Sequence, residues 1–209
     1  MKKISITFCL LLISLFIYSQ PQYTSRNGIY SFVELGIGGT IPQNENSDFS
    51  GVCVFFDNSP GYIFDNTFSN NTFSLGLGYS VKLFKLNSNL SEYSNKNTLL
   101  SFPIYFHGTY FHRRNEGKHT PFLNAKFGYE ALSKEINFEN KDDNVQWSKK
   151  YSGGLYASIS IGDLYEITDE DRLSLSITCR LHNYSIVDSN TKVEQKPISI
   201  SLNIGWFFY

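Results

Sequence analysis

The residues best able to do chemistry are charged side chains that stand alone among small polar residues. They are Glu34, Lys82, Lys126, Glu130, Arg172 and Arg180. Each lies in a segment where large apolar residues recur at alternate positions and many of the positions between them are Ser or Gly. Charges gathered in a narrow space are costly unless opposite signs pair. The set therefore predicts an internal ion-pair network with a structural role, and a gated narrow pore is the alternative use.

Nucleophilic catalysis is not indicated by the sequence. A serine hydrolase needs a hydroxyl, an imidazole and a carboxylate within hydrogen-bond reach of one another. His182 and Ser185 are close in the chain, but residues three apart on a strand point to opposite faces. We therefore expect no enzyme activity and assign no catalytic residue.

The histidines and the acidic turns do not predict a metal or cofactor site. His107 and His112 have opposite parity on a strand, and His119 lies in a basic turn. The acidic stretch 166–171 lacks the ligand spacing of a calcium loop. We expect no metal ion and no cofactor.

The segments that carry these residues alternate with period two, which is typical of β-strands. We predict strands near 28–41, 51–64, 73–84, 99–111, 121–132, 151–163, 172–184 and 196–209. The second strand is the least clear, because its alternation is weak and Asn58-Ser59-Pro60-Gly61 interrupts it. Pro103 lies inside the fourth strand, where its missing N–H predicts a bulge.

The predicted connections alternate between two kinds. If the chain starts in the periplasm, the inner turns are 65–72, 112–120 and 164–171. The outer loops are then 42–50, 85–98, 133–150 and 185–195, and they are longer on average, as in outer-membrane barrels.

Alternation alone leaves two kinds of barrel open. A soluble ligand-binding barrel has an apolar interior, whereas a membrane barrel has an apolar outer face. The polar face here is rich in Gly and Ser and poor in long charged side chains, which fits a narrow lumen better than a wet surface. Aromatic residues reach 16% and gather near strand ends, where they suit the lipid headgroup zone. We predict an all-β, eight-stranded antiparallel up-and-down transmembrane β-barrel, with Leu75, Ile159 and Leu175 facing outward.

The first 19 residues differ from the rest of the chain. Lys2 and Lys3 precede an apolar run over 4–18, which suits a signal peptide and is shorter than the ~20 residues of a spanning helix. We expect a cleaved signal peptide over 1–19 and one barrel domain over 20–209.

The net charge bears on nucleic-acid binding, and the positions of the cysteines bear on disulfide formation. The net charge of −1 gives no reason to expect a nucleic-acid partner. Cys53 and Cys179 fall on predicted strands that are not neighbours, so we expect no disulfide between them.

Five stretches carry a resemblance to a known family: FSLGLGYSVKLF (73–84), FPIYFHGTYF (102–111), PFLNAKFGYE (121–130), GLYASISIG (154–162) and SISLNIGWFFY (199–209). This pattern resembles the small OmpA/OmpX-type outer-membrane β-barrels, including the porin-like ones.

The resemblance implies a monomer in the outer membrane of a Gram-negative bacterium, surrounded by outer-membrane lipid. It also implies insertion by the barrel-assembly machinery, with Trp206, Phe208 and Tyr209 as the C-terminal signal. We expect a structural or surface-interaction role. The alternatives are a narrow solute channel, a lipid A-modifying enzyme and a soluble ligand-binding barrel.

Overall fold

A computed structural model describes residues 28–42, 47–49, 51–65, 71–86, 98–112, 118–140, 145–168, 171–188 and 191–208. The predicted signal peptide and Tyr209 lie outside these residues. Among the described residues, no helix is long and apolar enough to cross a membrane.

The described chain is built from strands, as the alternating sequence predicts. They are β1 (Gly28–Ile41), β2 (Gly51–Asn58), β3 (Gly61–Asp65), β4 (Asn71–Lys85), β5 (Thr98–His112), β6 (His119–Ala131), β7 (Ser133–Asn140), β8 (Val145–Ser152), β9 (Leu155–Glu166), β10 (Asp171–His182), β11 (Tyr184–Asp188), β12 (Thr191–Gln195) and β13 (Ile198–Phe208).

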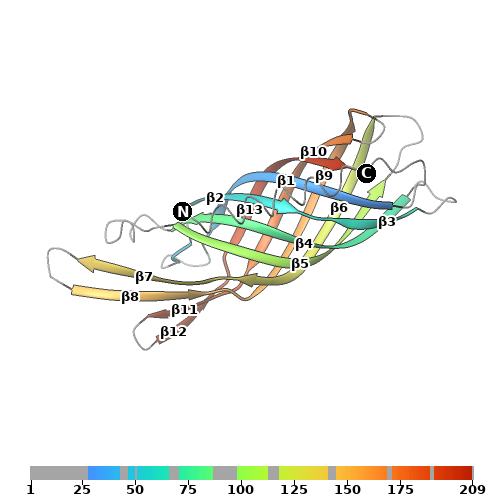
Figure 1. Cartoon of the computed structure of the whole chain (residues 1–209). Coiled ribbons are helices and arrows are strands. Elements are labelled where there is room, and N and C mark those ends of the chain that lie inside the picture. Colours follow the sequence, from blue (N-terminus) through green and yellow to red (C-terminus); the bar gives the residue numbers. More distant parts are fainter. Residues whose placement is uncertain are drawn as a thin grey trace, which may run out of the picture.

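Nine of these strands form one antiparallel sheet that closes on itself, because β13 pairs with β1. Strands β2 and β3 occupy a single position between β1 and β4, so the barrel has eight strand positions. The break at Ser59 and Pro60 does not shift the register: the Ser59 N–H still donates to the Phe32 carbonyl oxygen at 2.8 Å. The predicted eight-stranded antiparallel barrel is therefore confirmed (Figure 1).

The bulge predicted at Pro103 is wrong. Pro103 pairs with Glu130 in a regular register on one side. On the other side the β4–β5 ladder passes from Tyr79↔Ile104 to Lys82↔Ser101 without a change of register. The missing proline N–H is thus accommodated by a local opening of the ladder, without an inserted residue.

The large apolar residues point out of the barrel. Leu75, Ile159 and Leu175 are 50%, 53% and 66% exposed. In hydrocarbon every backbone polar group must be paired within the protein, and a closed sheet meets this condition. A closed sheet with an apolar outer face has the properties of a membrane-spanning barrel. The soluble ligand-binding barrel is excluded, because its outer face would be polar.

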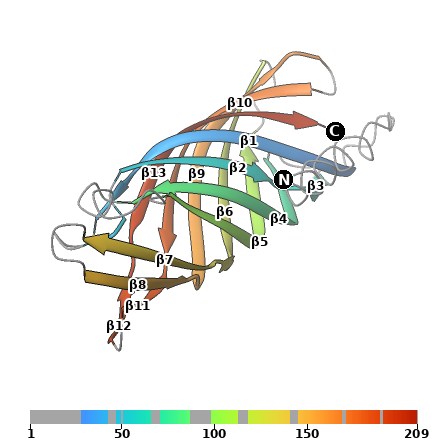
Figure 2. The ribbon, with the colours of Figure 1, turned by 60° about the vertical axis from the view of Figure 1, so that its left-hand side comes forward.

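Strands β7, β8, β11 and β12 form a second, four-stranded sheet that projects from one end of the barrel (Figures 1 and 2). We call this the hairpin end and the opposite end, where β13 finishes, the terminal end. The predicted outer loops 133–150 and 185–195 are therefore largely β-hairpins that continue the barrel strands. These strands are short and the segments are rich in charged residues, which is why the sequence indicated loops.

A bulge separates the barrel from this projecting sheet. The Glu130 N–H donates to the Gly154 carbonyl, and the Gly153 N–H donates to the Leu132 carbonyl, so Ala131 is an extra residue between two registers. A Cβ at Gly153 would overlap the Glu130 carbonyl oxygen. Glycine is therefore required where the chain passes from β8 of the projecting sheet into β9 of the barrel.

The outer face changes from apolar to polar across this bulge. On the barrel side, Tyr129, Leu155 and Leu181 are more than half exposed. In the projecting sheet, the first outward row is Ser133, Ser152, Ser185 and Glu194. The change marks where the apolar outer surface of the barrel ends on the side of the hairpin end.

Candidate functional site, a charged layer between two aromatic clusters

The inward positions of the barrel strands bring a set of ionisable side chains together in the lumen. They are Glu34 of β1, Asp57 of β2, Lys82 of β4, Lys126 and Glu130 of β6, and Arg180 and His182 of β10. Each residue is at most 3% exposed. This charged layer contains three carboxylates, two lysines and one arginine, so its formal charges balance when His182 is neutral.

Asp57 joins the first half of the layer. Its Oδ2 lies 2.8 Å from Arg180 Nη2 and 3.6 Å from Lys126 Nζ. Lys126 Nζ also lies 3.7 Å from Glu34 Oε2. The Ser176 hydroxyl donates to Glu34 Oε1 at 2.7 Å. Every charge in this half therefore has an opposite charge within 4 Å.

Glu130 joins the second half. Its Oε2 lies 2.9 Å from His182 Nδ1 and 3.8 Å from Lys82 Nζ. The hydroxyls of Tyr184 and Ser101 both donate to Oε1, the former at 2.5 Å. A buried carboxylate with this many donors is held in one geometry.

Aromatic rings complete the environment of the cations. Lys82 Nζ lies 3.7 Å from the centroid of the Tyr156 ring, and the Arg180 guanidinium carbon lies 4.0 Å from that of Phe55. Cations over aromatic faces are stabilised by the ring quadrupole, most strongly when water is excluded. The layer is thus packed as well as paired.

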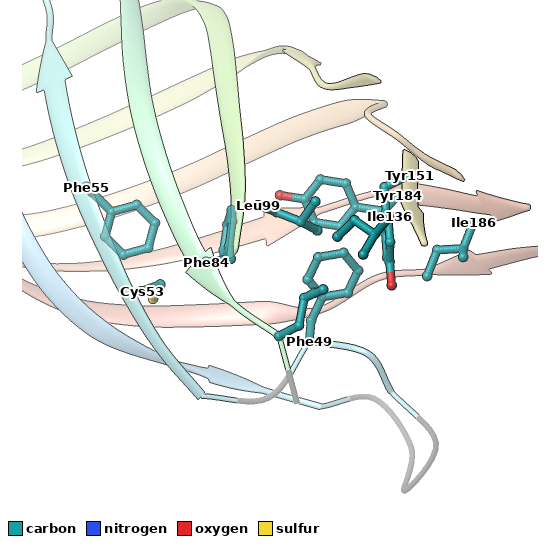
Figure 3. Packing of buried hydrophobic residues seen from close by; sticks show 10 residues of the cluster. Phe49, Cys53, Phe55, Phe84, Leu99, Ile136, Tyr151, Tyr184 and Ile186 are labelled. Atoms are coloured by element: carbon teal, nitrogen blue, oxygen red, sulfur yellow. The ribbon is translucent and has the colours of Figure 1, made fainter. Parts of the chain in front are cut away.

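Aromatic clusters lie on both sides of the charged layer. The terminal-end cluster consists of Tyr30, Phe32, Ile63, Phe111, Phe122, Leu164 and Phe207. The hairpin-end cluster consists of Phe49, Cys53, Phe55, Phe84, Leu86, Leu99, Ile136, Tyr151, Tyr184 and Ile186 (Figure 3). All of these side chains are at most 3% exposed. The described lumen is therefore filled along its length.

The structure places five of the six predicted charged residues in this layer. Arg172 lies instead at the terminal end, where its Nη2 is 3.6 Å from Glu166 Oε2 and its Nη1 is 3.3 Å from the Thr120 hydroxyl. Arg172 is the second residue of β10 and therefore lies at the terminal end of the strand, away from the charged layer.

Sequence reasoning missed Asp57 and His182. Asp57 lies in the strand with the weakest alternation, so its inward direction was not evident. His182 shares the parity of Arg180, and this signal was available.

One hydrogen-bonded chain in the lumen has the connectivity of a hydrolase triad. The Ser199 hydroxyl is 2.8 Å from His182 Nε2, and His182 Nδ1 is 2.9 Å from Glu130 Oε2. The His182 ring stacks on Tyr184 with centroids 5.7 Å apart and meets the edge of Phe84 at 5.2 Å. All three residues of the chain are at most 2% exposed.

The remaining candidate residues lie apart. His107 Nε2 is 2.9 Å from the Pro60 carbonyl oxygen, whereas His119 lies on the surface with Nδ1 2.6 Å from Asp163 Oδ2. The described residues contain no cluster of three or more His, Cys, Asp or Glu side chains placed to hold a metal. Cys53 and Cys179 are both free.

The predicted C-terminal signal lies on the last strand of the barrel. Trp206 Nε1 donates to Asp171 Oδ1 at 3.3 Å, and Phe208 pairs with both Ser31 and Asp171.

Comparison with known proteins bears on the fold. No family model matches the sequence, and no curated protein matches it. Neisserial surface protein A from Neisseria is similar in structure, with a TM-score of 0.51 at 10% identity over 88% of this chain and 99% of that one. The outer-membrane protease OmpT from Escherichia coli gives a TM-score of 0.42 at 11% identity over 91% and 99% of the two chains. Only the first score is high enough to support the fold, which is that of an eight-stranded outer-membrane β-barrel.

Proposed function

We propose that this protein is a non-conducting outer-membrane barrel whose projecting four-stranded sheet contacts partners outside the cell. The observation that carries the proposal is the filled lumen, in which a charge-balanced layer lies between two aromatic clusters. Moving an ion through this layer would separate buried pairs, and an uncompensated buried charge costs several kcal/mol.

The projecting sheet supports the surface role. Its outward face carries the row Glu135, Lys150, Val187 and Lys192. Among the described strands, β7 and β12 each have a partner on one side only. Open strand edges and charged exposed faces are features through which sheets contact other proteins.

The proposed orientation places the hairpin end outside and the terminal end in the periplasm. Longer connections at the hairpin end support this orientation, since outer-membrane barrels have short periplasmic turns. The same proposal includes export by the signal peptide over 1–19. It also includes insertion by the barrel-assembly machinery, which would recognise Trp206, Phe208 and Tyr209. The barrel then acts as a monomer surrounded by outer-membrane lipid.

We further propose that the protein is not an enzyme. The triad-like chain of Ser199, His182 and Glu130 is buried, and Glu130 is already held by Lys82 and Tyr184. Its hydrogen bonds therefore serve to satisfy buried polar groups. Lipid A profiles should be unchanged when the gene is deleted or when Ser199→Ala replaces the wild type.

Planar-bilayer recording tests the closed lumen. Purified refolded protein, shown to be folded by heat-modifiable gel migration, is expected to give no conductance steps. Reproducible steps from the folded protein would favour the narrow channel and contradict the proposal.

A further inference from the structure

A short segment between β1 and β2 inserts one aromatic ring into the hairpin end of the barrel. We call residues 47–49 the strap. Phe49 is 1% exposed and stacks on Tyr184, with centroids 4.4 Å apart and an interplanar angle of 19° (Figure 3). Phe84 and Tyr151 meet it edge-on, each with a centroid distance of 6.1 Å. Three rings from other strands thus surround the ring of Phe49.

Polar contacts at the rim hold the strap in place. The Asp48 carboxylate accepts from the Tyr151 hydroxyl at 2.9 Å and lies 3.0 Å from Lys149 Nζ. Gln195 Oε1 accepts from the Asp48 N–H at 3.1 Å and from the Ser47 hydroxyl at 3.2 Å. These partners belong to β8 and β12, so the strap is fastened across to the projecting sheet.

The strap lies outside the strand ladder. Strand β1 ends at Ile41 and β2 begins at Gly51, whose φ of 144° favours glycine. Each contact that fastens the strap involves at least one side chain, and none of those described is a hydrogen bond between two backbone groups. It can therefore leave its position without breaking any pairing of the barrel sheet.

We propose that the strap is a removable plug, and that Phe49 occupies a pocket that binds an aromatic ring from the outer side. The pocket walls are Phe84, Tyr151 and Tyr184, and the ligand class is a neutral aromatic group that replaces Phe49. Stacked and edge-on ring contacts supply the affinity, since such pairs are favourable beyond simple burial.

Cys53 is a natural reporter of the plug. It is fully buried in the same cluster as Phe49 and points into the barrel. In a Cys9→Ser, Cys179→Ser background it is the only thiol. Its reaction rate with a membrane-impermeant maleimide then measures how often the hairpin end opens.

Two substitutions release the plug in different ways. Asp48→Asn weakens the fastening and Phe49→Ala removes the ring. Each should raise the labelling rate of Cys53 by about tenfold or more, because charge-assisted contacts or a buried ring are lost. Phe111→Ala removes a ring of the terminal-end cluster and should leave the rate unchanged. All variants must retain heat-modifiable migration.

An added aromatic compound tests the pocket itself. In Phe49→Ala, p-cresol should slow Cys53 labelling in a saturable manner. In the wild type it should do so only at higher concentration, because Phe49 competes for the same pocket. The proposal is overturned if neither strap variant reacts faster than the wild type, or if the wild type already reacts as fast as unfolded protein. Absence of protection by p-cresol in a folded, reactive Phe49→Ala variant would equally overturn it.

Discussion

At the residue scale, the lumen of this barrel is organised around two carboxylates. Asp57 holds Arg180 and Lys126, while Glu130 holds His182, Lys82 and Tyr184. A buried charge is tolerated when its partner is present and becomes strongly destabilising when the partner is removed. The charged layer therefore fixes one arrangement of the side chains in the barrel interior, because any other arrangement would leave a buried charge without its partner.

Removal of the Asp57 carboxylate tests this role. Asp57→Ala leaves Arg180 without its nearest counter-ion and should lower the free energy of unfolding by about 3–5 kcal/mol. Glu166→Gln is the control, because it breaks the partly exposed pair with Arg172 and should cost at most about 1 kcal/mol. Urea unfolding in lipid vesicles measures both, and equal small losses would contradict a structural layer.

The phenol of Tyr151 gives a second prediction, on pH. Burial and the neighbouring Asp48 carboxylate raise the pKa of Tyr151 above its ordinary value. A raised folded-state pKa gives stability that is present below the unfolded pKa of about 10 and is lost as pH rises above it. Tyr151→Phe should therefore lose less stability than the wild type between pH 9 and pH 11. If the free energy of unfolding falls equally with pH in the two proteins, the contact between Tyr151 and Asp48 does not contribute to the pH dependence of stability.

At the element scale, alternation predicted the barrel strands because one face meets lipid and the other fills the lumen. The prediction was weakest where this two-sided environment ends. In β2 the alternation is blurred by Phe55 and Phe56, which hid Asp57. Beyond the bulge, β7, β8, β11 and β12 are short strands with charged residues on both faces, such as Lys149 and Lys150, so they lack the long apolar alternation of the barrel strands. The strap was not predictable, because its position depends on distant partners such as Gln195.

The bulge at the base of the projecting sheet depends on one glycine. Gly153→Ala places a Cβ against the Glu130 carbonyl and should lower the free energy of unfolding by about 1–3 kcal/mol. Gly39→Ala is the matched control, since a Cβ there has no neighbour within 4 Å. Denaturant midpoints measured for both should differ. Equal midpoints would mean that the strands leave the barrel without this close approach.

At the scale of the whole molecule, the proposed orientation predicts which end is reachable from outside the cell. Val187 lies on the outward face of the projecting sheet and is exposed, and Lys118 is exposed at the terminal end. In a cysteine-free background, Val187→Cys on intact cells should react with an impermeant maleimide. Lys118→Cys should react only after the outer membrane is permeabilised. The reverse result would invert the orientation.

The central claim is that the exposed apolar side chains of the barrel face lipid. Collision-accessibility electron paramagnetic resonance measures this directly, with nitroxide labels at Leu75→Cys, Ile159→Cys and Leu175→Cys in vesicles and Val187→Cys as the water-exposed reference. We predict that the three barrel labels collide more with oxygen than with a water-soluble nickel complex, and that the reference label shows the opposite. Labels at the three barrel positions that collide mainly with the nickel complex would contradict a membrane-spanning barrel.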